Sequence, residues 1–149
     1  MKLNIGDKAI DFKVKNQNGK EISLSDFKGK KIVLYFYPKD DTPGCTAEAC
    51  SLRDNYNSLI KQGYVVLGVS PDNEKKHLKF IEKYELPFDL LADTEQEIAN
   101  AYGVWVEKSM YGRKYMGIAR TTFIIDENGT IEEIIEKVDT KNHADQILK

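Results

Sequence analysis

The sequence contains too few cysteines to support a disulfide framework. Only two of its 149 residues are cysteine, and they lie at positions 45 and 50. Small secreted domains need several disulfides, and a reducing compartment would keep both of these cysteines as thiols at rest. We therefore expect the two cysteines to have a chemical role.

The sequence also lacks a long apolar run and an excess of charge of one sign. No stretch approaches the roughly 20 apolar residues that span a bilayer, and the N-terminal MKLNIGDKAIDF lacks the apolar block of a signal peptide. We expect a cytoplasmic protein with no membrane partner. The net charge is −2 with acidic and basic residues interspersed, so no basic stripe is available for a nucleic-acid backbone and we expect no nucleic-acid partner.

Length and composition predict a single folded domain over residues 1–149. The chain is 41% hydrophobic and 31% charged, which is ordinary for a globular protein and unlike a disordered or fibrous one. Its length suits one domain and is too short for two. No internal repeat or linker divides it.

Hydrophobic patterns predict alternating strands and helices, with hairpin turns at Asn18-Gly19 and Asn128-Gly129. The other predicted elements, in chain order, are a buried central strand at 31–38, a helix after Cys45, a second buried strand at 64–71, a helix within 71–86, a short strand at 88–93, a short helix at 94–104 and a terminal helix at 142–149. This order favours an α/β fold with a central mixed sheet, helices on both faces and an N-terminal β-hairpin. In the helix within 71–86, Leu78, Ile81 and Tyr84 recur at helical spacing.

The cysteines lie in a segment that reads YPKDDTPGCTAEAC, residues 37–50. At 100° per residue, one helical stripe is formed by Cys45, Ala49, Leu52, Tyr56, Leu59 and Ile60, and we expect this stripe to face the core. Cys50 lies about 140° from Cys45, on the side of Arg53, and we expect it at the rim or in solvent. The breaker sequence Thr42-Pro43-Gly44 puts Cys45 in the first helical turn, and Gly63 marks the end of the helix.

A first-turn cysteine has distinctive chemistry. Unpaired backbone N–H groups and the positive end of the helix dipole favour thiolate over thiol, which makes Cys45 a candidate nucleophile. On the helical wheel alone, a small buried apolar role for Cys45 is equally compatible. Metal binding is disfavoured because C-x4-C has no second pair and both histidines, His77 and His143, lie far away in sequence. The thioredoxin-type C-x-x-C is absent as well.

The segment FYPKDDTPGCTAEAC resembles the active-site motif of the peroxiredoxins, specifically their bacterioferritin comigratory protein or Q branch. The family pattern P-x-x-x-T-x-x-C falls on Pro38, Thr42 and Cys45, and the branch's resolving cysteine falls on Cys50. The resemblance covers nearly the whole chain, including GDKAIDF, VLGVSPD, LPFDLLAD and ARTTFIIDENG. The family's active-site arginine falls on Arg120, one of only three arginines among 22 basic residues.

The resemblance implies a thioredoxin-like fold and an atypical 2-Cys thiol peroxidase that uses no cofactor and no metal. Cys45 would attack hydrogen peroxide or an organic hydroperoxide and become a sulfenic acid, Cys50 would condense with it to a disulfide, and an external dithiol such as thioredoxin would reduce the bond. The resemblance also implies a monomer. The residues that would bind the peroxide or shape its pocket are Thr42, Gly44, Arg120 and Pro38.

Two other functional classes stay open, a thiol–disulfide oxidoreductase and a redox-sensing module without turnover. A disulfide exchanger needs neither Thr42 nor Arg120, and a binding module could lose Cys45 without consequence. The complete motif therefore favours the peroxidase.

Residues outside the motif are expected to contribute less to the function. The two histidines, His77 and His143, and the pair Asp40-Asp41 are predicted to be solvated surface groups. We assign no role to Trp105 or to the predicted loop at 104–117.

Overall fold

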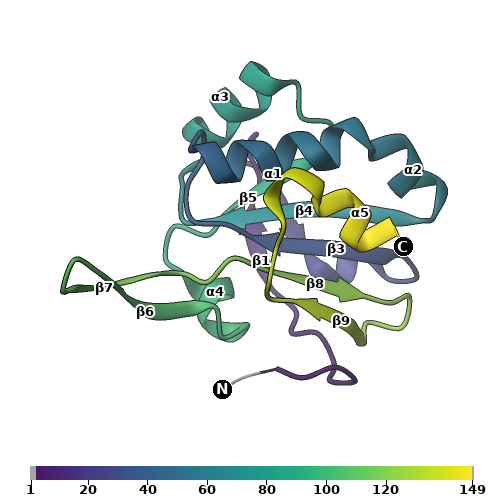
Figure 1. The fold of residues 1–149 in the computed structure, drawn as a ribbon. Coiled ribbons are helices and arrows are strands. Elements are labelled where there is room, and N and C mark those ends of the chain that lie inside the picture. Colours follow the sequence, from purple (N-terminus) through teal and green to yellow (C-terminus); the bar gives the residue numbers. More distant parts are fainter. Residues whose placement is uncertain (1–2, 149) are drawn as a thin grey trace.

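A five-stranded mixed sheet in the order β5-β4-β3-β8-β9 forms the centre of the molecule (Figure 1). The computed structural model describes residues 3–148, so the extreme ends of the predicted domain and residue 149 of the predicted terminal helix lie outside it. The strands are β3 (Lys31–Phe36), β4 (Tyr64–Ser70), β5 (Asp89–Ala92), β8 (Thr121–Ile125) and β9 (Ile131–Ile135). Strands β3, β4 and β5 are parallel, whereas β8 and β9 pair antiparallel. The predicted strand at 31–38 is the central strand, as expected.

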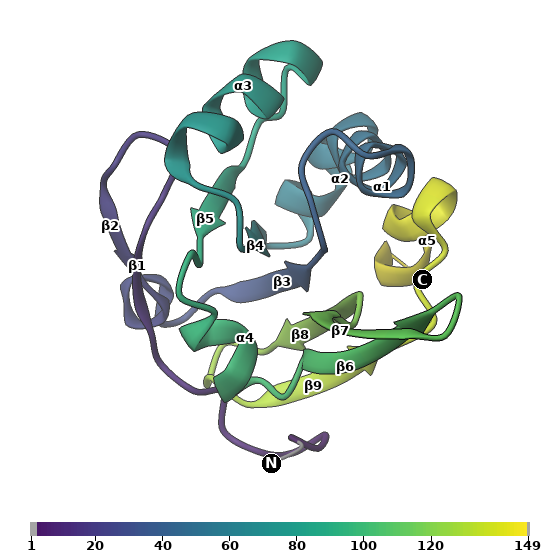
Figure 2. The ribbon, with the colours of Figure 1, turned by 90° about the vertical axis from the view of Figure 1, so that its left-hand side faces the viewer.

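Helices cover both faces of this sheet (Figure 2). One face carries α1 (Pro43–Asp54), α2 (Tyr56–Lys61), α3 (Glu74–Tyr84) and α5 (His143–Leu148), preceded by the 3-10 turn η2 (Thr140–Asn142). The other face carries α4 (Glu97–Ala101), the 3-10 turn η1 (Leu24–Phe27) and the hairpin of β1 (Lys13–Lys15) and β2 (Glu21–Ser23). Each face buries its own apolar cluster. The predicted mixed sheet with flanking helices and an N-terminal hairpin is confirmed.

The two predicted hairpin turns form where glycine permits them. Gly19 has φ +77° in the β1–β2 turn, and Gly129 has φ +78° between β8 and β9. These left-handed conformations suit glycine because it has no Cβ. Among residues 3–148, no helix is both long and apolar enough to cross a bilayer.

The predicted helix after Cys45 is interrupted at Asn55. This residue leaves the helical conformation at φ −113°, ψ 16°, and its side chain donates to the Ser51 carbonyl at 2.8 Å. The break separates α1 from α2. Leu59 is buried as predicted, but Ile60 is 52% exposed, so its placement in the core was wrong.

The predicted helix within 71–86 is confirmed as α3, but its buried face is only partly that of the apolar residues noted in the sequence. Leu78 is 37% exposed, whereas His77 and Phe80 are buried against the sheet, and Ile81 and Tyr84 pack at the margin of the core. Lysines are spread around this helix, so the sequence does not mark one face clearly as the buried one. The face that contains His77 is buried because that ring has hydrogen-bonding partners inside the protein.

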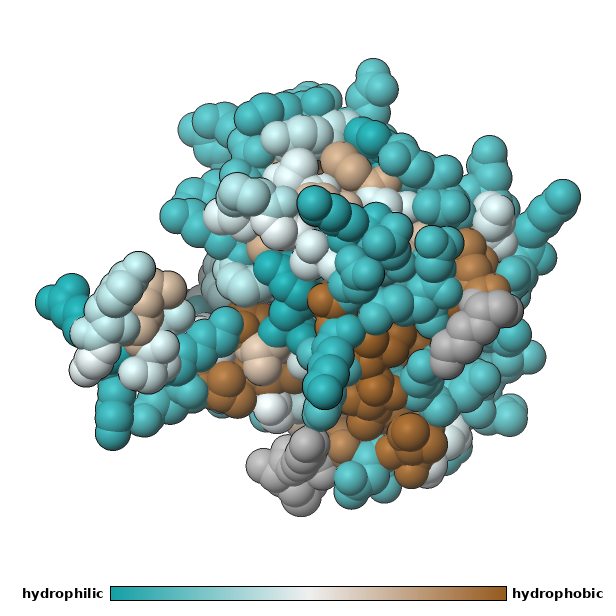
Figure 3. Space-filling view, in the orientation of Figure 1, coloured by the Kyte–Doolittle hydropathy of each residue, from teal (hydrophilic) through white to brown (hydrophobic). Residues whose placement is uncertain are grey.

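The predicted loop at 104–117 is a third hairpin, formed by β6 (Trp105–Met110) and β7 (Arg113–Ile118). Its turn uses left-handed residues Tyr111 and Gly112, at φ 53° and 78°. The hairpin projects from the body of the molecule, and its tip stands apart in the space-filling view (Figures 1 and 3). The segments WVEKSM and RKYMGI show no regular alternation of apolar and polar residues, which is why the sequence did not predict these strands.

The two faces of α3 should differ in their sensitivity to mutation. We expect Phe80→Ala to lower the free energy of unfolding by about 3–5 kcal/mol, because a buried ring is lost. Leu78→Ala on the outer face should cost less than about 1 kcal/mol. Denaturant unfolding of both variants measures the difference, and equal losses would contradict the observed orientation of the helix.

Candidate active site

Cys45 occupies the third position of α1, just beyond the carboxyl end of β3. Thr42 is the N-cap in an extended conformation and Pro43 begins the helix, as the breaker sequence predicts. The first bond of the helical ladder runs from the Thr46 N–H to the Thr42 carbonyl at 2.8 Å. Cys45 is 1% exposed, Cys50 is half-buried, and both are free thiols. The sulfur of Cys45 therefore lies beneath the surface at the positive end of a helix.

Arg120 meets Cys45 from the opposite side of the site. It directly precedes β8, whose first residue pairs with the last residue of β3, so the sheet carries it to the start of α1. Its Nη2 donates to the Cys45 Sγ at 3.3 Å, and its Nη1 donates to the Glu48 Oε1 at 2.7 Å. A forked guanidinium thus bridges two residues of the same helical turn.

The remaining residues of the predicted motif lie around this contact. A Cβ on Gly44 would come within 3.1 Å of the Arg120 Nη2, so glycine leaves space for the guanidinium. The hydroxyl of Thr42 donates to the Lys39 carbonyl at 2.9 Å and holds the loop that precedes the helix. Pro38 is half-buried where the chain leaves β3. The structure thus brings all the predicted site residues to one end of the sheet, except that Cys50 lies one and a half turns along α1.

Glu48 is a functional candidate that our sequence analysis missed. Its side chain is fully buried beside Arg120. Burial raises the pKa of this carboxyl to about 7, although the neighbouring Arg120 lowers it. Its position three residues after Cys45, on the same side of the helix, is the signal that could have identified it.

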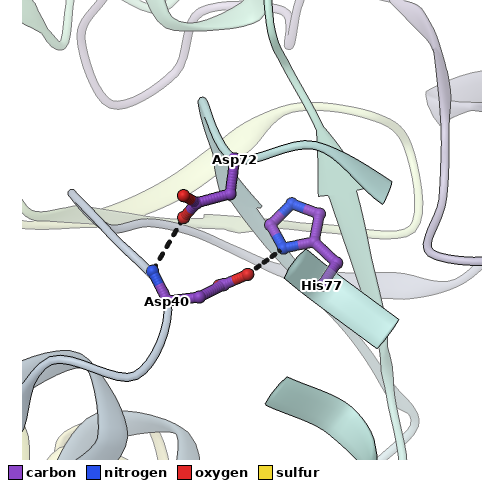
Figure 4. A group of neighbouring side chains, drawn as sticks. All are labelled: Asp40, Asp72 and His77. Atoms are coloured by element: carbon purple, nitrogen blue, oxygen red, sulfur yellow. Dashed lines mark hydrogen bonds and ion pairs between the residues drawn. The ribbon is translucent and has the colours of Figure 1, made fainter. Parts of the chain in front are cut away.

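A buried polar cluster braces the loop before α1 (Figure 4). Asp40 Oδ2 pairs with His77 Nδ1 at 2.6 Å, and the Asp40 N–H donates to Asp72 Oδ2 at 2.7 Å. The other ring nitrogen of His77 lies 2.9 Å from the Leu91 carbonyl oxygen. The prediction that His77 and Asp40 are solvated was therefore wrong, because each finds its partners in segments distant in sequence.

Asp40, Asp72 and His77 are residue types that can ligate metals, and their candidate atoms lie within 4.8 Å of one another. Those atoms already serve as hydrogen-bond partners: the Tyr37 and Ser70 hydroxyls donate to the two carboxylates, at 2.5 and 2.9 Å. We therefore assign the cluster a structural role in holding the loop.

The other two residues predicted to be solvated differ in outcome. Asp41 is exposed as expected, but it is also paired, accepting from Lys83 Nζ at 2.8 Å and from the Tyr84 hydroxyl at 2.7 Å. His143 is fully buried, so that prediction was wrong. Its ring contacts Thr122 and Gln146, and its Nε2 lies 3.4 Å from Glu48 Oε2.

Comparisons with known proteins show what this chain is similar to. The sequence profile of the AhpC/TSA family matches residues 5–134. Peroxiredoxin Bcp of Bacillus subtilis is 50% identical over 149 residues, which cover 100% of this chain and 95% of that protein. Peroxiredoxin Bcp of Escherichia coli K12 is 45% identical over 146 residues, with 98% and 94% covered.

Solved structures extend the similarity to the fold. Peroxiredoxin Q of Xanthomonas campestris superposes with a TM-score of 0.87 at 36% identity, covering 92% of this chain and 87% of that one. A peroxiredoxin Q mutant of Xylella fastidiosa gives a TM-score of 0.93 at 33% identity, with 99% and 94% covered.

The shared fold, and the thiol held at a helix N-terminus beside an arginine, define a thiol peroxidase of the thioredoxin-like class. Within that class the chain belongs to the AhpC/TSA family, among the peroxiredoxins of the Bcp or Q type. The family resemblance and the thioredoxin-like fold predicted from the sequence are both confirmed.

The buried carboxyl should make stability depend on pH. The pKa of Glu48 is raised from 4.5 to about 7 in the folded protein, so the folded state binds this proton more tightly than the unfolded state does. The resulting stabilisation is complete below pH 4.5 and is lost as pH rises to about 7. We expect the free energy of unfolding of the wild type, relative to Glu48→Gln, to fall by up to about 3 kcal/mol across this window.

Chemical denaturation of the two proteins at a series of pH values provides the measurement. Because the Gln variant shares every other titrating group, the difference between the curves isolates Glu48. A difference that stays constant with pH, or that grows as pH rises, would contradict the assignment.

Proposed function

We propose that this chain reduces hydrogen peroxide and organic hydroperoxides through Cys45, with Cys50 as the resolving thiol and an external dithiol such as thioredoxin as the reductant. The observation that carries the proposal is the Arg120 guanidinium, which donates to Cys45 Sγ and to Glu48 at the same time. A related protein, the bacterioferritin comigratory protein of Xanthomonas campestris, is described as having alkyl peroxide reduction activity. Neither alternative class requires this arrangement.

In the first step the Cys45 thiolate attacks one oxygen of the peroxide. The S–O bond forms with the sulfur electron pair, the O–O bond breaks, and its electrons leave with the second oxygen as hydroxide or alkoxide, which then takes up a proton. Negative charge moves from sulfur to the departing oxygen. Arg120 Nη2, which contacts sulfur before the reaction, is placed to donate to the peroxide as that charge moves.

The start of α1 supplies the other contacts. The N–H groups of Gly44 and Cys45 precede the first bond of the helical ladder, so they are available to a peroxide oxygen. Thr42 uses its hydroxyl proton on Lys39, which leaves its oxygen lone pairs to accept from a peroxide O–H. Half-buried Pro38 would shield the reacting atoms from water.

The second step joins Cys45 and Cys50. The Cys45 sulfenic acid condenses with the Cys50 thiol, releasing water and forming a disulfide, and a dithiol then reduces that bond and is itself oxidised. We further propose that the protein acts as a monomer in the cytoplasm.

Substitution of Arg120 by lysine should separate charge from geometry. Lysine keeps the cation but cannot hold Cys45 and Glu48 with two donors. We expect the second-order rate constant for hydrogen peroxide to fall severalfold or more in Arg120→Lys. Peroxide consumption with a thioredoxin-regenerating system measures it, with Arg113→Lys on the projecting hairpin as the matched control.

Either of two outcomes would count against the proposal. An unchanged rate constant in Arg120→Lys would remove Arg120 from the reaction. Reduction of insulin without any consumption of peroxide by the wild type would favour the thiol–disulfide oxidoreductase.

Formation of the disulfide should unwind the first turns of α1. Cys45 and Cys50 lie in one continuous helix, where Cα atoms five residues apart are roughly 8–9 Å from each other and their side chains diverge by about 140°. A disulfide requires less than about 7 Å between Cα atoms. We therefore expect the amides of residues 46–53 to be protected from hydrogen exchange in the reduced protein and to lose protection after oxidation.

Helix α3 is the internal control, because its protection should be the same in both redox states. The intramolecular disulfide would be verified by mass. Equal protection of residues 46–53 in the reduced and oxidised proteins would contradict the proposed resolving step.

A further inference from the structure

Among the described residues, two buried side-chain oxygens have no hydrogen-bond partner, Glu48 Oε2 and the Tyr35 hydroxyl. Glu48 Oε1 accepts from Arg120, but Glu48 Oε2 accepts from no donor in the described structure. His143 Nε2 lies 3.4 Å from Glu48 Oε2, and both side chains are fully buried. A buried carboxylate oxygen that is ionised and has no donor costs free energy. The question is therefore where a proton that would neutralise it is held.

Gln146 determines which nitrogen of His143 carries a proton. The Gln146 amide is oriented by two backbone groups, since its Oε1 accepts from the Asp139 N–H and its Nε2 donates to the Lys137 carbonyl, each at 3.0 Å. The oxygen is therefore the atom that faces His143 Nδ1, at 2.8 Å. An amide oxygen only accepts, so Nδ1 must carry the proton.

With Nδ1 protonated, a neutral imidazole presents a lone pair at Nε2. That nitrogen faces the Thr122 hydroxyl at 2.8 Å and Glu48 Oε2 at 3.4 Å. If Glu48 were ionised as well, its negative Oε2 would have no donor, because the Thr122 hydroxyl proton is directed to Nε2. One proton removes this uncompensated charge, either on Oε2 or on Nε2 with the Thr122 hydroxyl turned to accept.

Burial of Glu48 favours retention of that proton, whereas Arg120 opposes it by lowering the pKa of both Glu48 and His143. Arg120 faces both residues from the start of β8, and the buried hydroxyl of Tyr35 faces Glu48 from β3. Asp139 acts on His143 from the segment before η2. Burial raises the pKa of Glu48 to about 7, whereas burial lowers the pKa of His143, so the proton resides mainly on the carboxyl.

We propose that His143 is a positioning residue of the peroxide-reducing site, which shares one proton with Glu48 Oε2 and thereby keeps Oε1 directed to Arg120. This inference rests on the proposed function. The chain of contacts runs from His143 through Glu48 and Arg120 to the Cys45 sulfur. His143 touches neither the thiol nor the peroxide in this scheme and acts through the carboxyl.

Loss of the shared proton should weaken the site. Deprotonation releases the proton to solvent and leaves a full negative charge on Glu48, which competes with the Cys45 thiolate and the peroxide for Arg120. The reaction with peroxide should therefore show an inflection near the pH at which Glu48 titrates, about 7, with slower reaction per thiolate on the alkaline side.

The kinetic test uses the Cys50→Ser background, in which each molecule reacts once with hydrogen peroxide. Second-order rate constants are measured between about pH 5.5 and about pH 9 and divided by the thiolate fraction from parallel alkylation rates. His143→Gln offers an amide donor to Glu48 Oε2 but no exchangeable proton, so Glu48 stays ionised to lower pH. In His143→Gln we expect the inflection of the pH–rate profile to move below the neutral range. We expect the rate constant of this variant at about pH 6 to be lower than that of the parent protein by roughly threefold or more.

Two further variants identify the groups. Glu48→Gln should abolish the inflection. Lys141→Gln is the matched control, because it also introduces glutamine, but at an exposed position two residues before His143. It should leave the pH–rate profile unchanged. An inflection in His143→Gln identical to that of the wild type would overturn the inference while leaving the peroxidase function standing. Absence of any peroxide reaction in the parent protein would instead overturn the function.

A second measurement needs no substitution at His143. Long-range 1H–15N spectra of the reduced wild type contain ring signals from only two histidines, His77 and His143. His77 serves as the reference, because the Asp40 carboxylate and the Leu91 carbonyl, which face its two ring nitrogens, are both acceptors. At pH 8 we expect His143 to give the pattern of a neutral ring protonated at Nδ1. A neutral ring protonated at Nε2 would overturn the inference even if His143→Gln failed to fold.

Discussion

The bridge that Arg120 makes between Cys45 and Glu48 is the interaction on which the rest of the site depends. It places a permanent cation between a thiol that must ionise and a carboxyl that is buried beside it. Without the guanidinium, either acidic group would be a costly buried charge. With it, the local charge stays balanced while the fork points one donor at the sulfur.

The sheet makes this bridge possible. Strand β8 runs antiparallel to β3, so the residue that enters β8 arrives beside the segment that leaves β3 for α1. Gly44 then admits the guanidinium, because any side chain at that position would meet Arg120 Nη2. The site at the start of α1 thus depends on a strand pairing between residues 85 to 93 positions apart in the chain, from Phe36–Thr121 to Ile32–Ile125.

Two buried histidines support the site from different directions. His77, on α3, fixes the loop before α1 through Asp40, whereas His143, at the start of α5, faces Glu48 beneath the guanidinium. Both rings are fully buried with hydrogen-bonding partners on each nitrogen. The peroxiredoxin site is therefore surrounded by hydrogen-bonded polar networks that extend into the core. Such networks are rigid when every member has a partner, so they hold the polar groups of the site in fixed positions.

The sequence by itself determined the order of strands and helices, the two Asn-Gly hairpins and the position of Cys45 in the first turn of a helix, because each of these follows from local periodicity, glycine conformation or helix breakers. The family motif further identified Thr42, Cys50 and Arg120 as candidates. Only the tertiary structure decided that Glu48, Asp40, His77 and His143 are buried, that α1 ends at Asn55, and that the segment after Val104 is a projecting hairpin. A polar side chain is buried only where a partner from elsewhere in the chain satisfies it, and the partners here, including Arg120, the Leu91 carbonyl and Gln146, come into place only once the sheet and its covering helices have packed.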